Sequence, residues 1–340
     1  MKKRMKVFAM AMSMAMVATM TGGVNVSAKS KTTYRYVNTE RKDYSINAEG
    51  NLYLESEYKY AYDKKGNETL DLSISYDQAG NVNYESKWIT KYDKKNRIKT
   101  KKSYDAGKVS YTEKYTYKKN KTIQKDYDET KKLVLKIVTT KKKQKETIVY
   151  YNGKGKKLTT TTVLFDKKGH VVSEVVKKGK EILDETKKTY KKNVLTKEVR
   201  KSYTEEGYLS NKTESIYKKG KLLQEKHTMY EDGDFNSSWI HDYTYKGKYT
   251  YDTETFTSCY DDEVAKTVTK FKYDKGENRV KAWTKIYDND NLTSTITYKN
   301  ELYTSGKVKG FLKKEEGYRE GKLESRTTYK FKRIKVKVKK

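Results

Sequence analysis

Residues 62–81 read YDKKGNETLDLSISYDQAGN, in which one motif occurs twice. Each copy begins with tyrosine and aspartate and ends, after two further residues, with glycine and asparagine. An aspartate at the first turn position can accept a hydrogen bond from the backbone two residues on, which favours a type I turn. The glycine then supplies the left-handed residue that commonly follows such a turn in a hairpin and forms a bulge. The motif therefore predicts a chain reversal between two strands.

Degenerate copies of this motif recur along most of the chain, at intervals of about 14 residues in its second half. Nine or so residues between turns span roughly 30 Å when extended, so one interval holds one strand and one turn. Successive strands then run antiparallel. The repeat positions that we assign to turns are Tyr62, Asp63, Gly66, Asn67, Tyr76, Asp77, Gly80, Asn81, Phe165, Asp166, Gly169, Tyr217, Gly220, Tyr230, Gly233, Tyr273, Asp274 and Gly276.

Between the turns, residue types alternate with period two, which is typical of strands. In residues 109–117, for example, three tyrosines and a glutamate share one face and serine, threonine and lysine share the other. The sequence therefore predicts an all-β protein: a long antiparallel meander of tandem strand–turn repeats. We expect an elongated or curled sheet, with a partial barrel or a shell as the alternatives. The candidate binding aromatics are Tyr84, Trp88, Tyr111, Tyr115 and Tyr117.

Four local expectations follow from the same patterns. Residues 181–192 read weakly as a helix, and residues 141–144 as a turn without a tyrosine. The C-terminal run around Val336 predicts a last strand whose lysines protect an exposed edge. Since tyrosine supplies much of the 34% hydrophobic content, the core should be thin.

The N-terminus has the three parts of a secretory signal peptide. A basic start (Lys2 to Lys6) precedes an uncharged run over residues 7–26, and small residues lead to Ala28. We expect residues 1–28 to be a cleaved signal peptide and residues 29–340 to form a single β-repeat domain. No later segment is apolar for long enough to be a membrane span, so the mature protein should be secreted or associated with the cell wall.

The formal net charge is +32, with 77 lysines and arginines against 45 acids. A field of this size attracts polyanions. Export argues against nucleic acid as the partner, as does the fact that only nine of the 77 basic residues are arginine, the side chain best suited to reading bases. The expected partner is an anionic cell-wall polymer, a glycan or a surface protein.

No pattern for a catalytic, cofactor or metal site emerges, and we expect none of the three. His170, His227 and His241 are dispersed, and the acid pairs at Asp261 and Asp262, Asp232 and Asp234, and Asp288 and Asp290 fall at predicted turns, where acids are favoured for their hydrogen bonds. No carboxylate lies in apolar surroundings that would raise its pKa. The single cysteine, Cys259, excludes an intramolecular disulfide and reads as an ordinary strand residue.

The recurring motif at Tyr62 and Tyr76 resembles YD-repeat proteins of the Rhs type. That resemblance implies a bacterial surface or secreted protein whose β-hairpins form a shell around an interior. The spacing here is shorter and more irregular than in that family, lysine replaces acidic or neutral residues, and there is no room for a C-terminal toxin domain. A weaker resemblance is to choline-binding modules, whose aromatic clusters need more tryptophan than Trp88, Trp239 and Trp283.

Three functions from different classes remain open. The first is a non-enzymatic envelope protein that binds anionic polymer, glycan or protein through a basic, tyrosine-rich sheet. The second is a glycan-active enzyme, which an apolar pocket holding two close carboxylates would favour. The third is a shell that encloses a co-secreted partner.

Overall fold

The computed structural model describes residues 31–105, 107–247, 249–258, 265–273, 279–288, 291–303 and 311–338. The predicted signal peptide, residues 1–28, lies outside these ranges, as do Cys259, Asp274 and Gly276. Among the described residues, no helix is long and apolar enough to cross a membrane.

The described chain forms 22 strands that belong to one antiparallel sheet. The first half comprises β1 (Lys31–Ile46), β2 (Leu52–Tyr62), β3 (Glu68–Tyr76), β4 (Val82–Tyr92), β5 (Ile98–Asp105), β6 (Lys108–Lys118), β7 (Lys121–Asp128), β8 (Leu133–Lys142), β9 (Lys145–Asn152), β10 (Lys157–Phe165) and β11 (Val171–Lys178). The second half comprises β12 (Glu181–Lys191), β13 (Val194–Tyr203), β14 (Leu209–Lys218), β15 (Lys221–Glu231), β16 (Asp234–Lys246), β17 (Tyr249–Ser258), β18 (Ala265–Tyr273), β19 (Arg279–Asp288), β20 (Asn291–Leu302), β21 (Leu312–Arg319) and β22 (Lys322–Val338).

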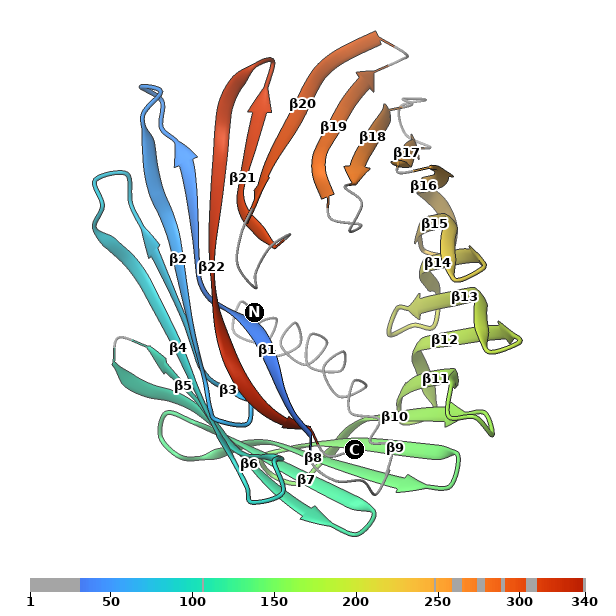
Figure 1. Cartoon of the computed structure of the whole chain (residues 1–340). Coiled ribbons are helices and arrows are strands. Elements are labelled where there is room, and N and C mark those ends of the chain that lie inside the picture. The colour runs from blue at the N-terminus through green and yellow to red at the C-terminus, as the bar shows by residue number, and fades with distance from the viewer. Residues whose placement is uncertain are drawn as a thin grey trace.

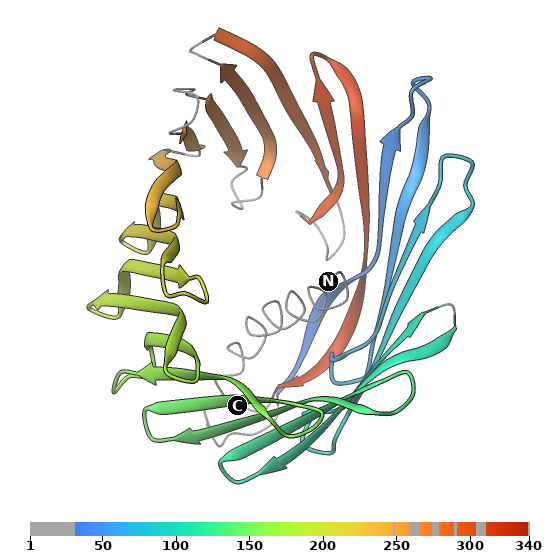
Figure 2. The same cartoon turned by 180° about the vertical axis from the view of Figure 1, so that it is seen from behind.

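Each strand pairs with its neighbours in sequence, and the last strand pairs with the first. The β1–β22 ladder runs from Lys31 opposite Val338 to Ser45 opposite Ser325, so the meander closes into a ring (Figures 1 and 2). The predicted all-β meander is confirmed, and its shape is a closed barrel. The expectation of an exposed C-terminal edge is wrong, because β22 lies between β21 and β1.

The residues expected to be weakly helical instead form β12, which is hydrogen-bonded to β11 and β13. Pairing on both sides overrides a weak local preference. The turn predicted at residues 141–144 is present: β8 ends at Lys142, Lys143 has a φ of 51°, and β9 begins at Lys145.

The anchor tyrosines mark a second feature of the hairpins. In most of them the strand register shifts by one residue immediately before the aromatic that closes the strand, as at Tyr62, Tyr76, Tyr190 and Tyr217. Such bulges increase the local twist and bend the strand. Repeated in successive hairpins, they supply the curvature that closes a long meander into a ring.

The aspartates of the motif hold the turns as the sequence predicts. The Asp63 carboxylate accepts the backbone N–H groups of Lys65 at 2.7 Å and Asn67 at 3.0 Å. The backbone N–H of Gly66, whose φ is +84°, donates to the Asp63 carbonyl oxygen at 3.0 Å. The turn at Asp77 repeats this backbone geometry.

The ring is a single-layer wall. Its strands contact their neighbours in the ladder, and its buried apolar side chains among the described residues are few: Val37, Ile137, Ile148, Val163 and Ala282. Cohesion therefore depends on backbone ladders and on side-chain pairs between adjacent strands.

Candidate binding surfaces

Side chains opposite one another on paired strands share a face, so the registers divide the wall into two faces that continue round the ring. We call one of them the acidic face. Its strand carboxylates include Asp43, Asp71, Glu113, Asp126, Glu146, Glu174, Asp184, Glu198, Glu225, Asp252, Glu254 and Glu315, with Arg41, Lys101, Lys188 and Arg200 among its bases.

We call the other side the lysine face. Its strand lysines include Lys42, Lys59, Lys87, Lys102, Lys114, Lys125, Lys136, Lys177, Lys187, Lys201, Lys212, Lys226, Lys270, Lys285, Lys299 and Lys314. Fewer acids lie among them, and the buried ones, Glu57 and Glu316, are paired with lysine or arginine.

Burial shows which face points inward. In a wall that curves onto itself, side chains on the concave side converge and lose solvent exposure. Most of the buried residues of the described chain are on the acidic face, including Glu113, Asp126, Thr161, Val163 and Ser215. The acidic face therefore lines the inside of the ring, and the lysine face covers the outside.

Carboxyl pKa shifts differ between the two faces, although Glu225 on the acidic face is an exception: burial acts to raise its pKa, but hydrogen bonds from Ser215 and His227 outweigh it and the pKa is lowered. On the acidic face, burial raises the pKa of Asp71, Glu113 and Glu174. On the lysine face, burial acts to raise the pKa of Glu57, but hydrogen bonds and charges from Lys59 and Lys42 outweigh it and the pKa is lowered. The expectation that no carboxylate has a pKa raised by its surroundings is therefore wrong. Only the register shows which acids face inward.

Two of the inward acids form a pair. Glu113 on β6 lies opposite Asp126 on β7, with solvent exposures of 3% and 0%. The hydroxyl of Tyr115 donates to Glu113 at 2.5 Å, and the Gln124 amide donates to Oδ1 of Asp126 at 2.9 Å. No described residue hydrogen-bonds Oδ2 of Asp126 at ordinary length. Burial raises the pKa of both carboxyl groups, against the hydrogen bonds that favour their charged forms.

The burial of Asp126 leads to a prediction about how the stability of the protein depends on pH. Because burial raises the pKa of Asp126, the folded protein keeps a proton that the unfolded chain releases near pH 4, so this group's contribution to stability falls as the pH rises towards neutral. Asp126→Asn removes the charge and keeps the shape. We expect it to raise the free energy of unfolding at neutral pH, by on the order of 1 kcal/mol, in urea titrations compared at pH 4.5 and 7.5.

The control lies two residues along the same strand. Asp128 caps the β7–β8 turn by accepting the backbone N–H groups of Thr130 and Lys132, and these bonds, with that from the Thr130 hydroxyl, lower its pKa. Asp128→Asn should therefore reduce stability at neutral pH. A loss of stability in Asp126→Asn at pH 7.5 would contradict the interpretation that the buried charge of Asp126 destabilises the folded protein at that pH.

Two histidines that look isolated in the sequence also meet on the acidic face. His227 on β15 and His241 on β16 are diagonal neighbours, with ring centroids 6.1 Å apart. Nε2 of His227 lies 2.8 Å from Glu225, and the ring nitrogens of His241 lie 3.4 Å from Asp252 and 3.4 Å from Glu254. A spacing of one repeat brings such residues onto adjacent strands, which is the signal that could have identified the pair.

In this patch the ring nitrogens of the two histidines lie beside carboxylates. Among the described residues, no three histidine, cysteine or acidic side chains are placed to hold a metal ion. His170 lies elsewhere, in the β10–β11 turn, where Nδ1 is 2.8 Å from Asp166 and the ring stacks on Tyr190 at 4.7 Å. Of the acid pairs noted in the sequence, Asp232 and Asp234 lie at the β15–β16 turn, Asp288 ends β19, and Asp261, Asp262 and Asp290 lie outside the described ranges.

All five candidate binding aromatics lie on the inward face. Trp88 packs edge-on against Tyr111 at 6.3 Å, and Tyr115 stacks on Tyr117 at 6.4 Å. Burial raises the pKa of Tyr111 and Tyr115. Tyr84, which is 54% exposed, is the most accessible of the set. The other four hold inner-wall contacts and are not presented on the outside.

Lysine side chains cover tyrosine rings on the outward face. The ammonium groups of Lys114, Lys136 and Lys299 lie 4.8, 5.3 and 4.5 Å from the ring centroids of Tyr127, Tyr151 and Tyr318, respectively. A cation over a ring is attracted by the electron density of its face, and the lysine stem covers apolar surface. This arrangement explains why a chain rich in tyrosine presents an outer wall dominated by charge.

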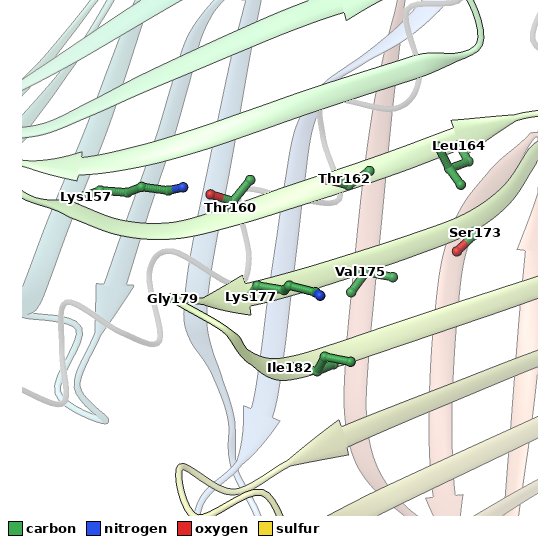
Figure 3. Close-up of a pocket in the computed structure, with 9 residues that line it drawn as sticks. All are labelled: Lys157, Thr160, Thr162, Leu164, Ser173, Val175, Lys177, Gly179 and Ile182. Atoms are coloured by element: carbon green, nitrogen blue, oxygen red, sulfur yellow. The ribbon is translucent and has the colours of Figure 1, made fainter.

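A groove of about 430 Å³ lies on the outward side of β10–β12 (Figure 3). Leu164 and Ser173 lie at one end, and Lys157 and Lys177 lie nearer Gly179 at the other (Figure 3). Val175 and Ile182 supply apolar lining, and no carboxylate lines the groove. It therefore lacks the acid or base that a glycan hydrolase requires.

No family model matches the chain, and no curated protein matches it. Among solved structures, a porin-like protein from Bacteroides vulgatus ATCC 8482 is 10% identical, with 87% of this chain and 99% of that chain covered and a TM-score of 0.25. A porin-like protein from Bacteroides uniformis ATCC 8492 is 10% identical, with 87% and 96% covered and a TM-score of 0.23. The structure of TcdB2-TccC3-TEV is 9% identical, with 92% of this chain but 27% of that chain covered and a TM-score of 0.15. Similarities with scores this low support no inference about function.

Proposed function

We propose that this chain is a non-enzymatic, exported protein of the cell envelope that binds anionic surface polymer through its outward lysines. The observation that supports the proposal is the separation of charge across the wall, with most strand lysines outside and most strand carboxylates inside. A polyanion that approaches the ring meets the positive surface first, and the inward acids, behind the wall, reduce that attraction little. Charge separated in this way raises the rate and strength of association with polyanions.

The choice of lysine over arginine supports an electrostatic mode of binding. Lysine is a compact point charge on a flexible stem, whereas arginine forms fixed two-pronged hydrogen bonds. A surface of lysines therefore selects for charge density and tolerates variation in the geometry of the polymer.

The prediction is tested with purified cell walls. We expect the protein to be retained at low ionic strength and released as salt rises through a few hundred millimolar, because exposed charges are screened over about 8 Å at physiological salt and less above it. Walls from which anionic polymer has been stripped are the control and should retain little protein. Retention that does not change with salt concentration would refute electrostatic binding.

The kinship with YD-repeat proteins is part of the same proposal. Its support is the turn geometry at Asp63 and Asp77 together with the closure of the repeats into a ring. A shell that encloses a co-secreted partner is the second candidate, and the inward acids favour a basic polypeptide as its contents. Pull-down from culture supernatant would recover such a partner at low salt.

An enzyme is less well supported by the buried pair. Glu113 and Asp126 are close carboxylates with raised pKa values, which is the combination that acid–base catalysis uses. Yet Asp126 is fully buried, so a substrate cannot reach it without opening the wall. The pair is better explained as part of the inner packing of β6 and β7.

A further inference from the structure

The turns of the barrel are not equivalent, because an up-and-down meander places alternate turns at opposite ends. The turns that lead from even-numbered to odd-numbered strands form one rim, and the others form the opposite rim. Adjacent lysine pairs occur in the β2–β3, β4–β5, β6–β7, β8–β9, β10–β11, β12–β13 and β14–β15 turns or at the strand ends beside them. All of these belong to the first rim, which we call the lysine rim.

The opposite rim has a different composition. Its described turns carry the acids Glu49, Glu129, Glu205, Glu206, Asp232 and Glu320, and adjacent lysine pairs occur at three of them, the β7–β8, β9–β10 and β11–β12 turns. Lysine pairs occur at both ends of the ring, but more turns of the lysine rim carry them, and fewer acids accompany them there.

Hydrogen bonds tie neighbouring turns of the lysine rim together. The side-chain amides of Asn67 and Asn96 exchange two hydrogen bonds of 2.5 and 3.0 Å between the β2–β3 and β4–β5 turns. The hydroxyl of Tyr92 donates to the carbonyl oxygen of Glu68 at 2.8 Å, and that of Tyr117 to the carbonyl oxygen of Ile98 at 2.8 Å. The backbone supporting the lysine pairs is thus held in place before any ligand arrives, which lowers the ordering cost of binding.

The spacing of the pairs suits an extended polyanion. Neighbouring turns on one rim are two strands apart, roughly 10 Å at the usual spacing of paired strands. This is close to the Debye length of about 8 Å at physiological ionic strength, so adjacent pairs reinforce one another. The lysines of these turns are exposed, and their pairs are followed by glycine, asparagine or glutamine, with no apolar side chain for insertion into a bilayer.

We propose that the lysine rim is the docking surface for a linear polymer of phosphate groups, which binds end-on to the barrel along this ring of lysine pairs. The inference rests on the proposed function and gives it a location and a direction: one end of the ring holds the polymer, and the opposite end and the inner wall stay free. Phosphate is the favoured group because lysine recognises it as a point charge without a planar, two-pronged geometry.

Two variants with the same change in charge test the placement. The rim variant replaces Lys64, Lys65, Lys94, Lys95, Lys218 and Lys219 with glutamine. The control variant replaces Lys131, Lys132, Lys154, Lys156, Lys180 and Lys322 on the opposite rim. All twelve are exposed, and each set contains one residue with positive φ, Lys219 and Lys131, so the local strain is matched.

Binding to long-chain inorganic polyphosphate is measured for the intact protein over a range of salt. We expect the rim variant to lose affinity about tenfold or more and to show a shallower dependence of log K on log salt, because fewer counterions are released. The control variant should stay within about threefold of the unsubstituted protein, since the acids in other turns of that rim offset much of the charge of its lysines. Unchanged melting temperatures show that both variants are folded.

Each result that would contradict the proposal overturns a different part of it. Equal losses in the two variants would overturn the rim placement while leaving electrostatic binding intact. Retention on cell walls without binding to polyphosphate would overturn phosphate as the ligand, as would a preference for vesicles of anionic lipid over polyphosphate. Failure to bind walls at any salt would overturn the proposed function itself.

Discussion

Replacing Thr327 with proline is expected to open the ring. Thr327 lies within β22, opposite Glu315 of β21 and Asp43 of β1, so it has a paired strand on each side. Proline cannot donate to a ladder and is confined to edges and bulges. We expect a loss of roughly 3 kcal/mol or more, and the freed edges of β1 and β22 should pair between molecules. Thermal unfolding and size-exclusion chromatography would show a lower melting temperature and soluble aggregates.

A proline in a turn provides the control. Lys64 occupies the second position of the turn that Asp63 holds, where the proline φ angle is the preferred one. Lys64→Pro should fold and elute at the same volume as the unsubstituted protein, although the natural chain contains no proline. If Thr327→Pro had the same melting temperature and elution volume as Lys64→Pro, the closing β1–β22 ladder would be refuted.

The turns were predictable because their signal is local. Aspartate, glycine and asparagine at fixed offsets dictate backbone geometry over five residues, and the structure reproduces this at residues 63–67 and 77–81. Strand direction follows from the turns, since each reverses the chain. The antiparallel meander could therefore be read from the sequence without knowledge of any distant contact.

The closure of the barrel and the division of its wall into two faces could not be predicted from local sequence signals. Closure depends on β1 meeting β22, almost the full length of the described chain away, and on many small bends at the anchor tyrosines. The face to which Asp126 belongs depends on registers that bulges shift by one residue. The His227 and His241 patch and the lysine rim arise in the same way, from residues far apart in sequence that the ladder aligns.

Substituting Gly153 with alanine is expected to destabilise the ring beside the β9–β10 turn. A Cβ on Gly153 would lie 1.9 Å from the carbonyl oxygen of Leu133 and 2.9 Å from its carbonyl carbon. Both atoms belong to the backbone at the start of β8, so no rotamer change can relieve the overlap. The strand would have to shift against β9, and overpacking of this kind costs about 3 kcal/mol.

Gly155 lies two residues further along in the same turn, and its substitution is the control that distinguishes the steric clash from backbone strain. It has a φ of +83° and nothing within 4 Å of its added Cβ, so Gly155→Ala should cost roughly 1–2 kcal/mol through its left-handed conformation alone. In urea titrations we expect a larger fall in midpoint for Gly153→Ala than for Gly155→Ala, with similar slopes. Equal losses would mean that β8 does not pass as close to the turn as the ladder requires. Because the wall has a single layer, a local displacement of β8 has no second sheet to resist it and must be absorbed by its neighbours in the ring.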